Sequence, residues 1–303
     1  MALILEPLAA LSVLVFVVGS MLSMGLSLTV ARLREALSNR RLVAKALVGN
    51  FLLVPLAAYA ILLVVPLTQA QSVGVLLLAT AAGAPFLPRL VESARGDIAL
   101  GVGLMVLLMV ATVVYVPLVL PLLLPGVAVS PLDIAQSLVL LMLLPLTAGL
   151  FVRARYPDTA EAVQPTAAQA SNTALVFLVV LALVLNFEAM LATIGTGVIL
   201  AVLLLVVAAF AVGFFLGGPG LDTRSVLGLG TAQRNVAAAL VVGTANFDDP
   251  DVIVVLVVGS TLMVVLLLLA GGELGRWAER PEERPATGTT GTDGGSTYED
   301  RSG

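Results

Sequence analysis

The chain has 303 residues, of which 59% are hydrophobic and only 11% are charged. Soluble domains carry roughly 25% charged residues, so the mean hydropathy of +1.10 is typical of a membrane protein and excludes an aqueous enzyme. The net charge of −4 offers no basic surface for nucleic acid, and the absence of cysteine and histidine excludes disulfides, thiol catalysis and histidine-based chemistry.

Apolar runs close to the length of a membrane-crossing helix, about 20 residues, follow one another along the whole chain. They are predicted at 8–30, 42–65, 73–94, 98–124, 134–152, 166–187, 194–216, 223–247 and 251–271. The sequence therefore predicts an all-α polytopic membrane protein with about nine transmembrane helices, in a transmembrane domain over residues 1–272.

The basic residues predict the orientation of these spans. In a nine-span arrangement every lysine and arginine except Arg234 falls on one side of the membrane, and eight or ten spans would break this sorting. By the positive-inside rule that side is cytoplasmic, so we expect the N-terminus outside and the C-terminus in the cytoplasm of a plasma-membrane protein. Residues 273–303, rich in Pro, Glu, Thr, Gly and Ser, are predicted to form a cytoplasmic, mostly disordered tail.

Two spans contain helix-breaking residues. Span three carries Gly83, Pro85 and Pro88, and span eight carries a Gly228-x-Gly230 pair followed by a polar run at 231–235. Proline removes a helix hydrogen bond and glycine weakens a helix. Freed backbone groups are tolerated at membrane depth where they line a cavity or are buried in protein. An ordinary kink in each span is the alternative interpretation.

The two broken spans are five apart and so cross the membrane in opposite directions. This predicts two inverted-topology repeats, over about 8–124 and 166–271, joined by the span 134–152, with the broken helices crossing beside the binding site. Superposing Thr80 on Thr231 also places Asp97 on Asp248.

Arg234 is the only basic residue predicted deep in a span. It lies ten residues beyond Arg224, about 15 Å along a helix and so near the middle of a ~30 Å hydrocarbon core. A charge at this depth is costly and needs a cavity or a partner, yet all 19 acidic residues fall in loops, span ends or the tail. Three partners for Arg234 stay open: an anionic substrate, backbone carbonyls, or an arrangement in which it stands in for a bound cation.

The other candidate binding residues lie near the breaks or near the midplane. They are Asn235, Gln233, Thr231 and Gly230 in span eight, Thr80, Gly83 and Pro85 in span three, Asn50 in span two and Asn172 in span six. Amides and hydroxyls can ligate cations or substrate oxygens, and they can equally hold helices together at about 1 kcal/mol each. For Asn50 and Asn172 both interpretations stay open.

At these positions the sequence resembles the bile acid:sodium symporter family. Residues 21–29 (Met-Leu-Ser-Met-Gly-Leu-Ser-Leu-Thr) are similar to its first-span signature and 51–55 to its Phe-Leu-Leu-x-Pro, while 82–90 and 230–239 resemble its two broken helices. The resemblance extends over about 8–272. It implies a core domain around two crossed broken helices, a panel domain, and alternating access for an organic anion.

The chain departs from the sodium-coupled members of that family. Their second broken helix typically has a Glu-x-Gly-x-Gln-Asn pattern. When the two are aligned on Asn235, Gly230 stands at the Glu position and Arg234 at the Gln position. Pro85 and Phe86 stand where the first broken helix carries Ser and Asn ligands. A hard cation needs oxygen ligands, so sodium is expected, if at all, near Thr231, Gln233 and Asn235.

We therefore expect a secondary active transporter that carries a small organic anion across the lipid bilayer. No cofactor is expected, except that a sodium ion could serve as the coupling ion. The alternatives are a sodium-independent anion transporter, a channel, or a non-transporting sensor. An intramembrane enzyme would need histidine or paired acids at membrane depth, which the sequence lacks. The oligomeric state is not encoded in any feature of the sequence.

Overall fold

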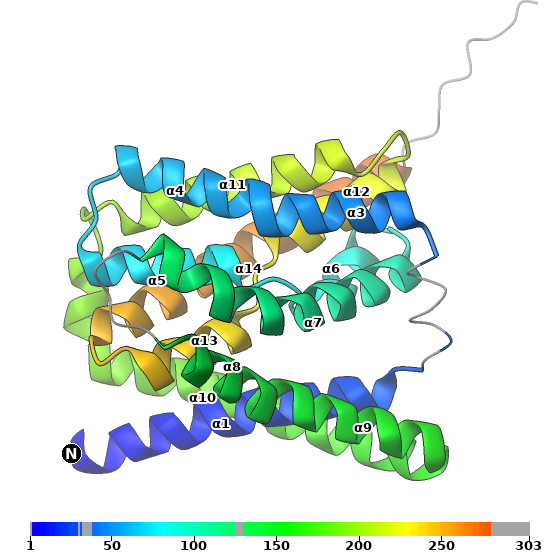
Figure 1. Ribbon diagram of the computed structural model, residues 1–303, viewed down its shortest axis with the longest axis horizontal. Helices are drawn as coiled ribbons and strands as arrows, with labels where there is room; N and C mark the ends of the chain where they lie inside the picture. Colours follow the sequence, from blue (N-terminus) through cyan, green and yellow to red (C-terminus); the bar gives the residue numbers. More distant parts are fainter. Residues whose placement is uncertain (1, 30, 32–37, 125–129, 280–303) are drawn as a thin grey trace, which may run out of the picture.

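The computed structural model describes residues 2–29, 31, 38–124 and 130–279, and within these ranges it contains helices and no strands (Figure 1). The elements are α1 (Ala2–Ser27), α3 (Arg40–Val48), η1 (Gly49–Leu53), α4 (Val54–Val64), α5 (Gln69–Thr80), α6 (Leu87–Ser93), α7 (Ile98–Leu123), α8 (Pro131–Leu138), η2 (Val139–Leu143), α9 (Leu144–Arg155), α10 (Pro157–Ala192), α11 (Val198–Leu216), α12 (Leu221–Ala232), α13 (Val236–Asn246) and α14 (Pro250–Glu279). The predicted all-α polytopic membrane fold is confirmed.

Seven segments of the described chain are long and apolar enough to cross a membrane. They are Ala10–Ser27, Arg40–Val64, Ile98–Leu123, Pro131–Arg155, Val198–Leu216, Leu221–Asn246 and Pro250–Glu279. The two further predicted spans correspond to the interrupted pair α5–α6 and to part of the long helix α10. The count of nine therefore stays a prediction. Helix α14 continues to Glu279, beyond the predicted end of the transmembrane domain at 272, and the rest of the predicted tail lies outside the described residues.

Two spans contain a single π-helical turn, η1 between α3 and α4 and η2 between α8 and α9. Each precedes a proline, Pro55 or Pro145, by two residues. Proline has no N–H to donate, and its ring crowds the carbonyl four residues earlier. A π turn adds one residue and lets the helix continue past that point. The turn η1 carries Asn50, which is fully buried.

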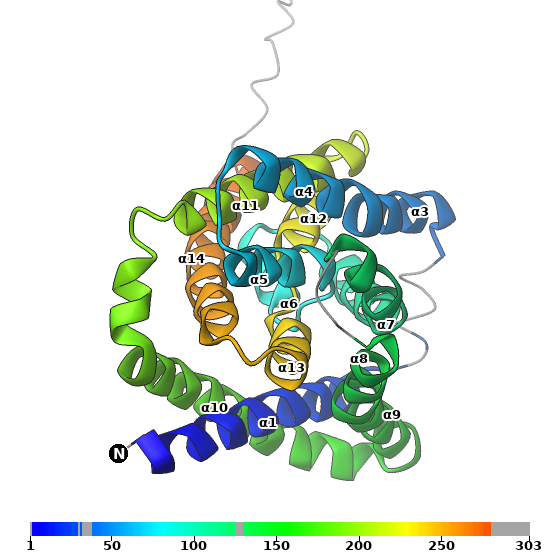
Figure 2. The same ribbon diagram turned by 60° about the vertical axis from the view of Figure 1, so that its left-hand side comes forward.

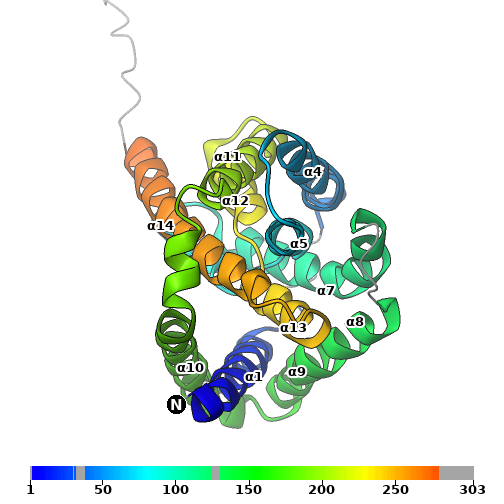
Figure 3. The same ribbon diagram turned by 90° about the vertical axis from the view of Figure 1, so that its left-hand side faces the viewer.

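The helices form two layers, which we call the panel (α1, α9 and α10) and the core (α3–α7 and α11–α14). The panel helices pack on one another and lie across one side of the core, next to α13 and α14 (Figures 2 and 3). A Cβ on Gly25 of α1 would lie 2.9 Å from the Cα of Gly149, so paired glycines allow α1 and α9 to touch. Ser171 of α10 donates to the Phe16 carbonyl of α1 at 2.8 Å.

Both predicted broken helices are interrupted, but not at every predicted residue. The first break spans 81–86 and the second 233–235. Helix α12 runs through Gly228 and Gly230, so the predicted break at this pair is wrong. A glycine costs a helix about 1 kcal/mol relative to alanine but keeps its N–H. Pro88 lies in the first turn of α6 and does not interrupt the helix, because an N–H is dispensable there.

The two broken helices share one layout. Each consists of a 12-residue helix, a short unwound segment and a second short helix, and each is followed by a long apolar helix. The first halves end at Thr80 and Ala232, and the long helices that follow begin at Ile98 and Pro250. Both pairs are 152 positions apart, one more than in the superposition of Thr80 on Thr231.

Candidate functional site

The two breaks meet inside the core. The backbone N–H of Asn235 donates to the Ala81 carbonyl at 2.9 Å, and its side-chain amide donates to the Gly83 carbonyl at 2.9 Å. The Asn235 side-chain oxygen also accepts from the backbone N–H of Ala238 at 3.0 Å and so caps α13. Because α5 packs against α13 and α6 against α12, the helices cross at their unwound segments, as predicted.

Helix α7 holds the first break in place. The Thr112 hydroxyl accepts from the Ala82 N–H at 2.9 Å and donates to the Ala82 carbonyl at 3.0 Å, so one side chain satisfies both backbone groups of an unwound residue. Gly83 has a φ of +80°, and a Cβ there would collide with the Met109 nitrogen. Sequence reasoning missed Thr112, although a single threonine in a largely apolar span was an available signal.

Arg234 lies within this crossing with 1% of its surface exposed. Its Nε donates to the Leu78 carbonyl at 2.9 Å, and its Nη2 donates to the Ala79 carbonyl at 2.6 Å. Its Nη1 donates to Asn50 Oδ1 at 2.8 Å and to the Thr231 carbonyl at 2.9 Å. Four of the five guanidinium N–H groups therefore have oxygen acceptors.

The three backbone carbonyls among these acceptors lie at helix ends that favour a cation. Leu78 and Ala79 belong to the last turn of α5, and Thr231 to the last turn of α12. Carbonyls in a last turn lack intrahelical partners and carry the negative end of the helix dipole. Of the three predicted partners for Arg234, the structure contains the backbone carbonyls.

No acidic side chain neutralises Arg234 within the described chain. Two ion pairs are found there. Arg95, just after α6, pairs with Glu279 of α14, and Arg276 pairs with Glu273 within α14. The guanidinium is thus hydrogen-bonded by neutral dipoles and keeps its net positive charge.

Asn50 and Thr231 join the second span to this cluster. The Asn50 amide donates to the Ala46 carbonyl at 3.0 Å and to the Thr231 hydroxyl at 3.1 Å, while its oxygen accepts from Arg234. These bonds attach the second span to the second broken helix, and a role of Asn50 in binding stays a prediction. Gln233 differs, because its Oε1 is the one side-chain oxygen or nitrogen of the described chain that is fully buried without a hydrogen-bond partner.

Comparison with known families gives one finding that bears on this arrangement. A family model described as the sodium bile acid symporter family matches residues 13–193, which is more than half of the chain. The chain belongs to this family. Its members are transporters, so the coarse prediction of a membrane transporter with a transported solute is confirmed. No curated protein matches the chain.

The match to the sodium bile acid symporter family covers the first broken helix and ends before α11. Arg234 and the second broken helix therefore lie outside the matched residues. The resemblance predicted from the sequence extended to residue 272, and its last part is not tested by this match.

Several predicted site residues of this family member make no hydrogen bond to the Arg234 guanidinium among the described contacts. The Thr80 hydroxyl donates back to the Leu76 carbonyl at 2.8 Å. Gly230 is helical, and a Cβ there would lie 3.0 Å from Leu104. Pro85 belongs to the first break. Asn172 is exposed on α10, and no described hydrogen bond joins it to the cluster.

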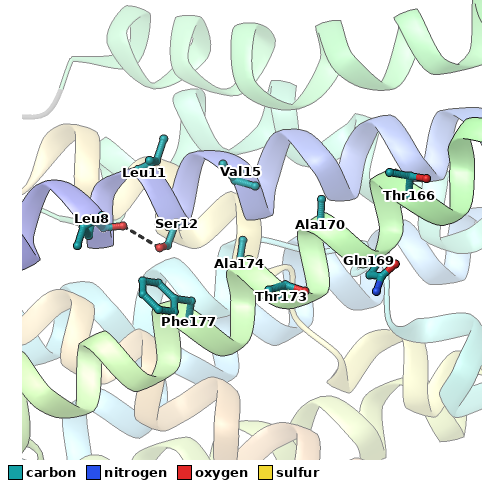
Figure 4. Close-up of a pocket in the computed structure, with 10 residues that line it drawn as sticks. All are labelled: Leu8, Leu11, Ser12, Val15, Thr166, Gln169, Ala170, Thr173, Ala174 and Phe177. Carbon is teal, nitrogen blue, oxygen red and sulfur yellow. Dashed lines mark hydrogen bonds between the residues drawn. The ribbon is translucent and has the colours of Figure 1, made fainter.

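A pocket of about 510 Å³ lies between α1 and α10 of the panel (Figure 4). It is lined by apolar residues together with four polar ones, Ser12, Thr166, Gln169 and Thr173, and none of the predicted site residues borders it. Asn172 lies about 100° around helix α10 from Thr173, so its side chain projects from another face of that helix. This pocket is therefore separate from the crossing of the broken helices.

The family description raises the question of whether a sodium ion fits near Thr231, Gln233 and Asn235. The Thr231 hydroxyl and the Asn235 side-chain oxygen already accept hydrogen bonds, and the Thr231 carbonyl accepts one from Arg234. Within the described chain this leaves Gln233 Oε1 as the unengaged side-chain oxygen of the three, and Gln233 is followed directly in the chain by Arg234, which has the same charge as the ion. The residues present do not fit a sodium ion.

Proposed function

We propose that this protein is a secondary transporter that carries a small organic anion across the plasma membrane by alternating access. One observation carries the proposal: a buried guanidinium, without an acidic partner in the described chain, lies where two broken helices cross. Its positive charge favours an anion bound at the boundary between core and panel. A carboxylate about 8 Å away would gain about 2 kcal/mol at an effective dielectric constant of 20.

The two-layer arrangement supports alternating access. Broken helices with matching layouts in two halves of a chain are typical of inverted-repeat transporters, where one layer rocks against the other around a fixed site. In this proposal the core carries the site and the panel moves against it. The panel residue Asn172 is exposed and is assigned to contact the substrate from the panel side.

Three residues around the second break complete the proposed site. Asn235 and Thr231 hold the two breaks and Asn50 together, and Gln233 offers a free acceptor. Substrate is proposed to reach the Arg234 region when the panel moves. The proposed orientation has the N-terminus outside and the C-terminus in the cytoplasm, as the distribution of basic residues predicts.

The deciding experiment is uptake into proteoliposomes that contain the purified full-length protein. Small organic carboxylates should be taken up saturably, while an organic cation of the same size should not. Binding without flux would indicate a sensor, and an electrical conductance that does not saturate would indicate a channel. Either result would contradict the proposal.

Asn50→Asp tests the role of the positive charge. The substitution is nearly isosteric, so the carboxylate still accepts from Arg234 while the Thr231 hydroxyl can turn to donate to it. It also neutralises Arg234, and removing about 2 kcal/mol of attraction lowers anion affinity roughly 30-fold. Gln136→Glu adds a negative charge at an exposed position of α8, outside the proposed site, and should leave the KM unchanged. An Asn50→Asp protein with unchanged KM would show that the charge of Arg234 does not serve the substrate.

A further inference from the structure

The oxygens around the Arg234 guanidinium are arranged like the ligands of a bound cation. Four neutral oxygens surround it at 2.6–2.9 Å, namely Asn50 Oδ1 and the carbonyls of Leu78, Ala79 and Thr231. They come from three separate spans. No carboxylate contributes, so the set is matched to a single positive charge and not to a divalent ion.

The position of these oxygens has a general meaning in transporters. Where half-helices end near the midplane, their C-terminal carbonyls and the unwound backbone beside them coordinate sodium ions or protons. Here both half-helix ends, that of α5 and that of α12, point their carbonyls at the same guanidinium. The cation that a broken-helix transporter usually takes from solution is supplied in this chain by a side chain.

A free cation and the guanidinium cannot share this set of oxygens. Arg234 is fully buried, and the backbone of its own residue is fixed as well, because its N–H donates to the Met263 sulfur at 3.2 Å. A second positive charge at the same oxygens would be repelled and would have to break the existing hydrogen bonds.

From this geometry we infer that Arg234 is a tethered cation that replaces the coupling sodium ion, so that transport by this protein does not depend on sodium. The inference rests on the proposed function, since it concerns what accompanies the anion. It also makes a separate statement about binding: the wild-type protein has no sodium site at the crossing, and removing the guanidinium creates one.

The first test is uptake by the wild-type protein in proteoliposomes with sodium replaced by choline on both sides. The initial rate should change less than twofold. A loss of more than tenfold in choline would overturn the inference while leaving anion transport intact. If no anion is taken up in either medium, the proposed function fails, and the binding test below still decides the inference.

The second test measures the thermal unfolding midpoint of purified protein in detergent, at equal ionic strength in sodium or choline chloride. Wild type should show the same midpoint in both salts. Arg234→Ala should be less stable and should regain stability on addition of millimolar guanidinium or of sodium, because the emptied oxygens accept a free cation. Arg224→Ala, which removes an arginine in the first turn of α12, should show no such rescue.

Two results would contradict the inference in this second test. One is stabilisation of wild type by sodium as large as that of the Arg234→Ala protein. The other is an Arg234→Ala protein that folds and responds to neither cation. If Arg234→Ala does not fold, Arg234→Lys keeps the charge with fewer donors, and it should fold and remain indifferent to sodium.

Discussion

At the scale of single residues, Arg234 and Gln233 are adjacent in the chain but differ in whether their buried polar groups have hydrogen-bond partners. Four of the five N–H groups of the Arg234 side chain have acceptors, whereas the Gln233 oxygen is buried and has none in the described chain. A buried acceptor without a partner costs about 1–3 kcal/mol. An unpaired buried acceptor at a helix break is consistent with a ligand that donates a hydrogen bond to it.

Gln233→Leu should therefore stabilise the protein and impair transport. Removing the unsatisfied oxygen is expected to raise the free energy of unfolding by about 1 kcal/mol, since an apolar side chain of similar size has no desolvation cost. The unfolding midpoint and the KM for uptake measure the two effects. A variant that is more stable and transports with an unchanged KM would remove Gln233 from the proposed site.

Thr112 is the second residue whose role is visible only in the structure. Thr112→Val keeps the shape of the side chain but leaves the Ala82 N–H and carbonyl without partners, at a cost on the order of 1–3 kcal/mol. We expect a lower unfolding midpoint and slower uptake. Thr112→Ser keeps the hydroxyl and should retain most of both. Equal behaviour of the two variants would show that the hydroxyl is not what holds the break.

At the scale of elements, the broken helices depend on two conditions: a backbone that can leave the helix, and partners for the groups this frees. The first break meets both through Gly83 and Thr112. The second break has no glycine of its own. Its backbone N–H groups at Asn235 and Arg234 donate to the Ala81 carbonyl and the Met263 sulfur, and the side chains of the same two residues donate to carbonyls of the first break and of α5. The Gly228-x-Gly230 pair misled the sequence prediction because glycine permits a break without requiring one.

Gly83→Ala should disrupt the first break, whereas a matched substitution elsewhere should not. The new Cβ would meet the Met109 backbone, and the φ of +80° disfavours any residue other than glycine. We expect loss of folded protein or of uptake. Gly272→Ala in α14 meets nothing within 4 Å and should be neutral or stabilising by up to about 1 kcal/mol. Normal uptake by Gly83→Ala would contradict this account.

At the scale of the whole molecule, the panel and core layers agree with alternating access, and the basic residues predict how the molecule sits in the membrane. The chain has no cysteine, which makes it suited to single-cysteine labelling.

Asp248→Cys and Asp158→Cys test the orientation. Both positions are exposed, the first before α14 and the second in the first turn of α10. In intact cells a membrane-impermeant maleimide should label the cysteine at position 248 and should reach position 158 only after permeabilisation. The reverse pattern would invert the orientation, and labelling of both from outside would refute the three spans predicted between the two positions.

The sequence by itself determined the membrane class, the helical fold, the approximate spans and the one deep charge, because hydropathy and charge placement are local properties that a bilayer constrains strongly. Only the tertiary structure decided what that charge touches. Its partners are mainly carbonyls of Leu78 and Ala79, more than 150 positions away in the chain, and a backbone carbonyl is present at every residue and leaves no mark in the sequence. Packing between segments that are distant in the chain likewise decides two further features. These are the grouping of α1, α9 and α10 into one layer and the hydrogen bonds from Thr112 to the first break.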